Sequence, residues 1–256
     1  MMAQPILKVD KLTKIFTRKG QPDFTAVDHV NFELYPGECL GLIGESGSGK
    51  TTVVNMITRL LDPTEGSIVL DGEDITNLSG RELRRAYANM QMVFQTPTDS
   101  FDPRCTLGDG IGESLRNRGM SRADTKKEVA RLLTECGLTP EFAERYPHQV
   151  SGGQCQRAAI ARALAVKPKL LICDEATSSL DVTIQKEIIA LLNELRWQHG
   201  INLSILFICH DIALVQQFCN RVLVLYKGKI VEHGEPDEII RNPQDPYTKR
   251  LIDSIL

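Results

Sequence analysis

A glycine-rich stretch between residues 44 and 52 has the composition of a phosphate-binding loop. It matches the pattern G-x-x-x-x-G-K-T, which ends at Lys50 and Thr51. Glycines let the backbone turn so that successive N–H groups point inward, and a following helix adds the positive end of its dipole. We therefore expect Lys50 to reach the β- and γ-phosphates of a nucleotide and Thr51 to bind Mg²⁺. The residues predicted to surround the phosphates are Gly44, Glu45, Ser46, Gly47, Ser48, Gly49, Lys50, Thr51 and Thr52.

The flanking residues give this loop the context that the pattern requires. The apolar run from Cys39 to Ile43 is typical of a buried strand. Apolar residues at helical spacing, the last of them Leu60, predict a helix from Thr51 to Leu60. A glycine-rich turn without a ligand is the alternative, and the order of strand, loop and helix favours the phosphate site.

Two adjacent carboxylates, Asp174 and Glu175, follow a second apolar run from Leu170 to Cys173. Ligands gather at the carboxyl ends of strands in a parallel sheet, so we expect these side chains to face the phosphates. Asp174 could then reach the Mg²⁺ bound by Thr51. Glu175 could orient or deprotonate a water that attacks the γ-phosphate. A solvated acidic turn is the alternative, which the hydrophobic strand disfavours.

A third motif, Ser151-Gly152-Gly153-Gln154, precedes a helical stretch. A serine N-cap followed by two glycines exposes backbone N–H groups at a helix N-terminus, which is a second anion site about a hundred residues from the first. We interpret two half-sites in one chain as a sign that the site is shared between two chains. A plain helix cap is the alternative, but it leaves Gly152, Gly153, Gln154 and the following Arg157 unexplained.

Composition limits the possible classes of function. The 256-residue chain has 30 Lys and Arg against 33 Asp and Glu, a net charge of −3, which disfavours a nucleic-acid partner. Its seven cysteines show no C-x-x-C spacing, as expected for reduced thiols in a cytosolic compartment. We find no signal-peptide pattern and no run of about 18 apolar residues, so membrane association would depend on a partner.

The order of predicted elements indicates an α/β chain with a helical insertion. Alternating residues predict half-buried strands at 6–12 and 24–34, which would form a small antiparallel layer with a short strand at 67–70. A further strand at 91–94 ends at Gln95. From 106 to 147 only helical periodicity is found. Strands at 170–173, 204–209 and 222–226 then alternate with helices at 154–166, 182–199 and 212–218, and the tail after 237 predicts two short helices.

Together these motifs resemble the nucleotide-binding subunit of an ATP-binding cassette (ABC) transporter, in order and spacing along essentially the whole chain. The family's Walker A and Walker B motifs match Gly44 to Thr52 and Leu170 to Glu175, and its signature matches Ser151 to Gln154. Shorter family motifs are matched elsewhere, namely the Q-loop by Gln95, the D-loop by Ser179-Leu180-Asp181 and the switch histidine by His210.

The resemblance implies roles for several of these residues. Gln95 would contact the metal and sense the nucleotide, His210 would bind the γ-phosphate, and Asp181 would belong to the nucleotide site. Phe16 would stack on adenine, although an aromatic at a strand end is as often part of the core. Val150 and Cys155 depart from the Leu and the basic residue that are common in the family signature. Because the backbone donors do not depend on these side chains, we expect ATP binding to survive both.

The resemblance also implies the architecture. It is an α/β P-loop NTPase (RecA-like) core with a small antiparallel β layer and an inserted all-helical subdomain. The core would comprise residues 1–95 and 159–256, and the helical subdomain 96–158, with the signature motif. The implied cofactors are ATP and Mg²⁺.

Four further segments resemble the importers of dipeptides, oligopeptides and nickel, namely Met90 to Gln95, Ser100 to Arg104, Asn242-Pro243 and Asp245 to Leu251. The implied function is the ATP-hydrolysing motor of a peptide importer. Alternatives are nickel or metal-chelate import, a soluble ABC ATPase that acts on ribosomes or DNA, and a different P-loop enzyme such as a kinase. Many members of this group bind an iron–sulfur cluster through a later cysteine-rich segment; no cysteine follows Cys219, so we predict no cluster.

The implied partners are a second ABC ATPase subunit, two membrane permease subunits and an external solute-binding protein, without nucleic acid. The second subunit would be a paralogue or another copy of the chain, and the assembly would place it at the cytoplasmic face of the inner or plasma membrane. The loop from Thr96 to Thr106 would transmit force, because it joins Phe101 to the stiff turn formers Pro97 and Pro103. We expect an exposed Phe101 to line a groove for a short helix of the membrane subunit. The alternative is that Phe101 only covers the helical insertion.

Overall fold

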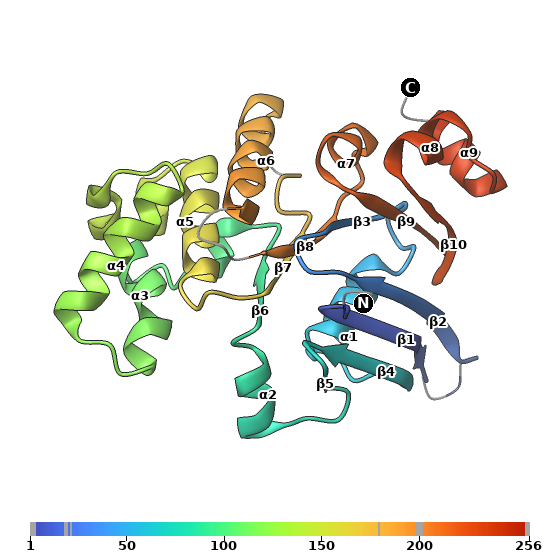
Figure 1. Cartoon of the computed structure of the whole chain (residues 1–256), viewed down its shortest axis with the longest axis horizontal. Helices are drawn as coiled ribbons and strands as arrows, with labels where there is room; N and C mark the ends of the chain where they lie inside the picture. The colour runs from blue at the N-terminus through green and yellow to red at the C-terminus, as the bar shows by residue number, and fades with distance from the viewer. Residues whose placement is uncertain (1–3, 18–19, 21, 179, 198–201, 254–256) are drawn as a thin grey trace.

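The computed structural model describes residues 4–17, 20, 22–178, 180–197 and 202–253. Two sheets organise the chain (Figure 1). The antiparallel sheet has the order β2-β1-β4-β5, with β1 at Leu7–Phe16, β2 at Phe24–Leu34, β4 at Glu65–Leu70 and β5 at Glu73–Asp74. The second sheet has the order β10-β9-β3-β8-β7-β6, with β3 at Cys39–Ile43, β6 at Met90–Val93, β7 at Leu170–Asp174, β8 at Ser204–Ile208, β9 at Arg221–Tyr226 and β10 at Lys229–Gly234. Strands β9, β3, β8, β7 and β6 are parallel, and β10 is an antiparallel edge strand.

Helices cover the second sheet and form a block at one end of the molecule. The covering helices are α1 (Lys50–Ile57), α5 (Gly152–Leu164), α6 (Val182–Trp197) and α7 (Ile212–Phe218). The block, at the left of Figure 1, contains α3 (Leu107–Asn117) and α4 (Arg122–Glu135), with 3₁₀ turns η1 (Pro97–Ser100), η2 (Pro140–Glu144) and η3 (Pro147–Gln149). Helix α2 (Gly80–Ala86) lies outside both, whereas α8 (Pro236–Arg241) and α9 (Pro246–Asp253) pack against β10 of the second sheet. In the described part of the chain, no helix combines the length and the hydropathy needed to cross a bilayer.

The hydrophobic core consists of two clusters, one on each face of the parallel strands. In β3, Leu40 and Leu42 face α1 and the antiparallel sheet, whereas Cys39 and Ile43 face the other helices. This alternation is the two-residue period of a strand that is covered on both faces. The second cluster runs without a break from the parallel strands into α3, α4 and α5. The predicted boundary at 158/159 lies within α5, and the division into domains stays a prediction.

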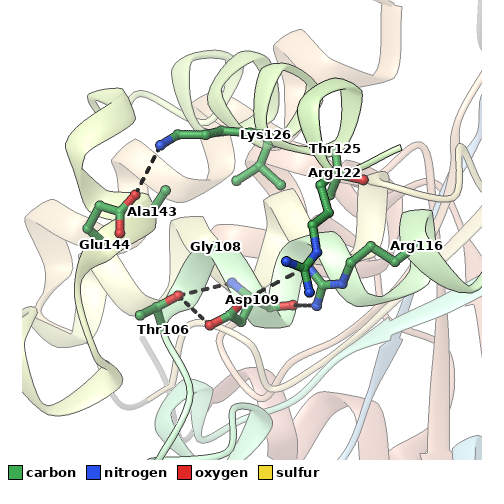
Figure 2. A pocket seen from close by; sticks show the side chains of 10 residues that line it. Thr106, Gly108, Asp109, Arg116, Arg122, Thr125, Lys126, Ala143 and Glu144 are labelled. Atoms are coloured by element: carbon green, nitrogen blue, oxygen red, sulfur yellow. Dashed lines mark hydrogen bonds and ion pairs between the residues drawn. The ribbon is translucent and has the colours of Figure 1, made fainter. Parts of the chain in front are cut away.

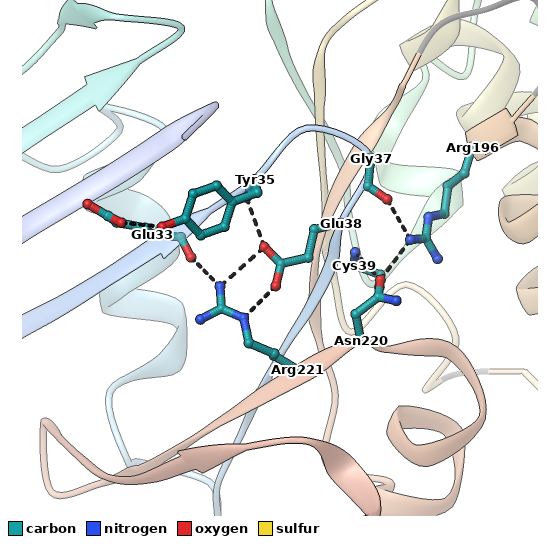
Figure 3. Close-up of polar contacts among 8 residues, drawn as sticks. All are labelled: Glu33, Tyr35, Gly37, Glu38, Cys39, Arg196, Asn220 and Arg221. Carbon is teal, nitrogen blue, oxygen red and sulfur yellow. Dashed lines mark hydrogen bonds and ion pairs between the residues drawn. The ribbon is translucent and has the colours of Figure 1, made fainter. Parts of the chain in front are cut away.

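A network of polar contacts fixes the turn that precedes β3 (Figure 3). The buried Arg196 of α6 donates to the carbonyl oxygen of Gly37 at 2.6 Å and to Asn220 Oδ1 at 2.8 Å. Asn220 Oδ1 also accepts from the backbone N–H of Cys39 at 2.9 Å. The start of the phosphate-loop strand is therefore held from two sides.

All seven cysteines are free, and all except Cys105 are buried. Burial raises the pKa of Cys136 to about 12 and that of Cys155 to about 11, so both thiols stay protonated near neutral pH. Cys155, in place of the family's basic residue, therefore packs as a small apolar side chain.

Several sequence predictions need correction. The helix after the phosphate loop ends at Ile57, so Leu60 lies outside it and its side chain is 64% exposed. Strand β6 ends at Val93, which leaves Phe94 41% exposed. Phe101 is only 5% exposed and belongs to the core cluster of the helical block, so the prediction of an exposed Phe101 was wrong. Strand β10 and helix α2 were not predicted.

Candidate active site

The glycines of the phosphate loop are required by its packing against neighbouring backbone. Gly44 and Gly49 have φ angles of 152° and 111°, where other residues are strained. A Cβ at Gly44 would lie 2.3 Å from the carbonyl oxygen of Leu225, and one at Gly49 would lie 2.8 Å from that of Ala26. The loop therefore rests on β9 and β2, and larger side chains would lift it off both strands.

Lys50 begins α1 and is buried near the carboxylates of Asp174 and Glu175. Its Nζ donates to the carbonyl oxygens of Gly44 at 2.6 Å and Glu45 at 3.0 Å. Burial lowers the pKa of Lys50, and the nearby charges of Glu175 and Asp174 act in the opposite direction. The lysine is therefore folded back onto its own loop, within the electrostatic reach of both carboxylates.

The two carboxylates occupy the end of β7 and the residue after it. Burial raises the pKa of Asp174, the charge of Glu175 adds to this shift, and Lys50 opposes it. Glu175 has a φ angle of 48°, a conformation that is strained for a residue with a side chain and that often marks functional sites. Its N–H donates to the carbonyl oxygen of Ile208 in β8 at 3.1 Å, which fixes this conformation.

A pocket of about 290 Å³ joins the loop to Glu175, whereas Asp174 and Gln95 do not line it. Lys50, Thr51 and Glu175 line it together with two aromatic side chains, Phe16 and Phe24. The two phenylalanines pair across β1 and β2. Phe24 was not predicted as a site residue, and its pairing with Phe16 follows from a first strand that extends beyond the predicted 6–12 to Phe16.

Gln95 follows β6 and is linked to the backbone of Glu175 by a short chain of hydrogen bonds. Its Nε2 donates to Ser178 Oγ at 3.2 Å, and Ser178 Oγ donates to the carbonyl oxygen of Glu175 at 2.9 Å. A change at Glu175 can therefore reach the segment that leads into the helical block.

Ser151, Gly152, Gly153 and Gln154 do not line this pocket. Ser151 caps α5, because its Oγ accepts from the N–H of Gln154 at 3.2 Å and its own N–H donates to Gln154 Oε1 at 2.9 Å. A Cβ at Gly153 would lie 2.7 Å from Ile184, so this glycine also permits the close packing of α5 on α6. The fold thus keeps this motif apart from the chain's own phosphate pocket.

Asp181 and His210 also lie outside the pocket lining. Asp181 caps α6, where its Oδ1 accepts from the N–H groups of Thr183 at 3.1 Å and Ile184 at 3.0 Å. His210 follows β8 and is exposed. Ser179 lies outside the described residues.

A larger cavity, of about 600 Å³, lies within the helical block (Figure 2). Four of its charged side chains are paired: Lys126 with Glu144 at 3.5 Å, and Arg116 with Asp109, whose carbonyl oxygen it also contacts at 2.9 Å. Since none of the predicted site residues lines it, size alone does not locate the active site.

Comparison with known proteins decides the family. A family model described as "ABC transporter" matches residues 27–178. The chain belongs to the ABC transporter family. The oligopeptide transport ATP-binding protein OppF of Salmonella typhimurium is 45% identical over 232 residues, which cover 90% of this chain and 69% of OppF.

Two further comparisons extend this result. The glutathione import ATP-binding protein GsiA of Pectobacterium atrosepticum is 45% identical over 260 residues, 99% of this chain, and the match spans only 41% of GsiA. The solved dimer of the ATP-binding cassette MJ0796 with ADP and Pi is similar at a TM-score of 0.81 and 31% identity, and the similarity covers 90% of this chain and 98% of that one. The predicted P-loop NTPase fold is thus confirmed, and the chain contains an ABC ATPase cassette.

Proposed function

We propose that this chain is the ATP-hydrolysing motor subunit of a peptide importer. The observation that carries the proposal is the convergence of Lys50, Thr51 and Glu175 on one pocket, with a glycine loop on one wall. Relatives named for oligopeptide transport and glutathione import support peptides as the class of solute.

The chemistry follows from the groups around the pocket. Backbone N–H groups of residues 44–52 would bind the phosphates, and Lys50 would exchange the carbonyl oxygens of Gly44 and Glu45 for phosphate oxygens. Glu175 would orient or deprotonate the attacking water. Phe16 and Phe24 would flank adenine, since both are aromatic and line the same pocket.

The donor set also fits Mg²⁺. Two carboxylates beside one lysine leave a net negative charge next to the loop, and the Thr51 hydroxyl, the Asp174 carboxylate and the Gln95 amide are oxygen ligands of the kind that Mg²⁺ prefers. Bound there, the ion would neutralise phosphate charge. No cluster of three or more His, Cys, Asp or Glu that could hold a metal occurs among the described residues, so phosphate oxygens would have to complete the coordination.

We further propose that the site is completed by a second cassette. Ser151 to Gln154 lie outside the chain's own pocket, and the similar cassette MJ0796 was solved as a dimer. ATP would then lie between Gly44 to Thr51 of one subunit and Ser151 to Gln154 of the other, with Asp181 and His210 at the same interface. The second subunit would be a paralogue or another copy of this chain.

The permease subunits would dock in a groove next to Gln95, on the cytoplasmic face of the membrane. This groove, of about 420 Å³, lies between the end of α1, β6 and α3, and its lining includes Leu60, Met92, Phe94 and Arg162. Leu60 and Phe94 are exposed apolar residues. We assign to them the docking role that the sequence interpretation gave to Phe101. A short helix of the permease would bury them, and an external solute-binding protein would deliver the solute.

The substitution Glu175→Gln tests the proposed chemistry. The variant should bind ATP but hydrolyse it ~10²–10⁴-fold more slowly, because the positioned base is lost at a cost of about 3–5 kcal/mol in the barrier. Glu73→Gln, the same change on an exposed strand, is the control. When Glu175→Gln is mixed with Mg-ATP and candidate partner cassettes, light scattering should show the mass of a dimer. Near-normal ATP turnover by Glu175→Gln would show that Glu175 is not the base. A monomer mass in light scattering that Mg-ATP does not change would contradict the site shared between two subunits.

A further inference from the structure

The C-terminal helix α9 reaches the phosphate loop through one hydrogen bond. The hydroxyl of Tyr247 accepts from the backbone N–H of Glu45 at 2.9 Å, across 202 positions of sequence. Tyr247 is only 3% exposed, so water does not readily replace this contact. The first peptide of the phosphate loop is therefore tied to a helix near the end of the described chain.

The position of this hydroxyl is itself fixed. The ring of Tyr247 stacks on that of Tyr226, at the end of β9, with centroids 4.0 Å apart. The N–H of Tyr247 donates to Asp245 Oδ1 at 2.7 Å. The carboxylate of Glu232 in β10 accepts from the N–H groups of Gln244 at 2.8 Å and Asp245 at 3.0 Å. Two strands of the sheet thus set where the hydroxyl points.

The peptide that Tyr247 holds is also the one that holds the phosphate-binding lysine. The N–H of the Gly44–Glu45 peptide donates to Tyr247, and the carbonyl oxygen of the same peptide, that of Gly44, accepts from Lys50 Nζ at 2.6 Å. Further along the loop, the N–H of Gly228 donates to the carbonyl oxygen of Ser48 at 2.8 Å. The β9–β10 turn and α9 therefore support the loop through residues that do not line the pocket.

We propose that Tyr247 is a positioning residue of the nucleotide site. Its hydroxyl keeps the start of the phosphate loop, and through it Lys50, in the conformation that accepts a nucleotide. Without the hydroxyl the loop samples other conformations, and the apparent affinity falls with the fraction of competent loops. The proposal rests on the nucleotide site proposed above, and it makes that site dependent on the docking of α9.

The test is Tyr247→Phe, which keeps the stacked ring and removes only the hydroxyl. Tyr226→Phe is the matched control, because the Tyr226 hydroxyl makes no hydrogen bond among the described residues. We expect Tyr247→Phe to raise the Kd for ATP, from competition with a fluorescent ATP analogue, by about three- to tenfold, the value of one hydrogen bond. KM should rise in parallel while kcat at saturating ATP stays within about twofold, because Glu175 is untouched. Tyr226→Phe should change neither.

Three outcomes separate the possibilities. An unchanged Kd in Tyr247→Phe, with or without a lower Tm, shows that the residue only packs α9 and overturns the proposal. Glu232→Gln, which loosens the α9 turn but retains the tyrosine, should raise the Kd as well, and it replaces Tyr247→Phe if that variant does not fold. Lys50→Ala reports on the nucleotide site itself. If the Kd for ATP is normal in both Lys50→Ala and Tyr247→Phe, the proposed nucleotide site is wrong. If the Kd is raised in Lys50→Ala but normal in Tyr247→Phe, only the role of Tyr247 is refuted.

Discussion

Replacing Phe101 with alanine should destabilise the fold by about 3–5 kcal/mol, the range for a phenylalanine removed from a packed core. The ring fills the space beside Gly110, where even a Cβ would lie 2.6 Å from Phe101 Cδ1. The guanidinium of Arg162 lies 4.8 Å from the ring centroid and also donates to the carbonyl oxygen of Ser100. Because Gly110 has no side chain to move into the gap, the cavity would stay open and leave Arg162 without its aromatic contact.

Urea denaturation of the isolated chain measures this loss. A change of 3 kcal/mol corresponds to a fall in Tm of about 6–12 °C for a chain of this size. Phe24→Ala is the control, since Phe24 is 64% exposed and its removal should change stability by no more than about 0.5 kcal/mol without nucleotide. If Phe101→Ala loses less than about 1 kcal/mol, the ring is not part of the core. In that case, a loss of transport in Phe101→Asp could be attributed to lost docking. If Phe101 is buried, the same loss would instead reflect a destabilised fold.

Two further substitutions test the supports of the site. Arg196→Ala should lower the stability to urea by about 2–4 kcal/mol, because the carbonyl oxygen of Gly37 and Asn220 Oδ1 lose a buried charged donor; a loss near zero would mean that the network does not hold the turn before β3. Leu60→Asp together with Phe94→Asp should leave stability and ATP binding unchanged but abolish recruitment to vesicles that contain the permease subunits; normal recruitment would place the docking site elsewhere.

Elements with a strong local signal were predicted well from the sequence. The bounds of β3 and α7 were predicted to the residue, because a buried apolar run and a capped amphipathic stretch are visible without tertiary contacts. Strand β10 was missed although the pair Lys227-Gly228 precedes it in the sequence. In the structure these two residues form a two-residue hairpin turn, with φ angles of 46° and 77°. The sequence Lys-Gly is a weaker marker of that turn than Asn-Gly.

The burial of single aromatic residues could not be predicted. Phe101 and Phe94 both lie in or next to a polar loop, and their sequence surroundings do not distinguish them. Phe101 is buried because Gly110, on α3, offers a space that only the folded helical block creates. Phe94 is exposed because β6 ends one residue earlier than its apolar run. Both facts depend on how α3 packs on the sheet, which is a property of the whole fold.

The same distinction applies to the site. The local sequence explains why glycines stand at 44 and 49, but the backbone atoms that require them belong to Leu225 and Ala26. With the contact from Tyr247, the loop is held by segments that both precede and follow it in the chain by many residues. Because loop and supports must assemble together, nucleotide affinity should report on the folding of β9 to α9 as directly as on the loop's own sequence. A motif that is complete in sequence is therefore only part of a phosphate site, and its conformation is decided by residues outside that motif.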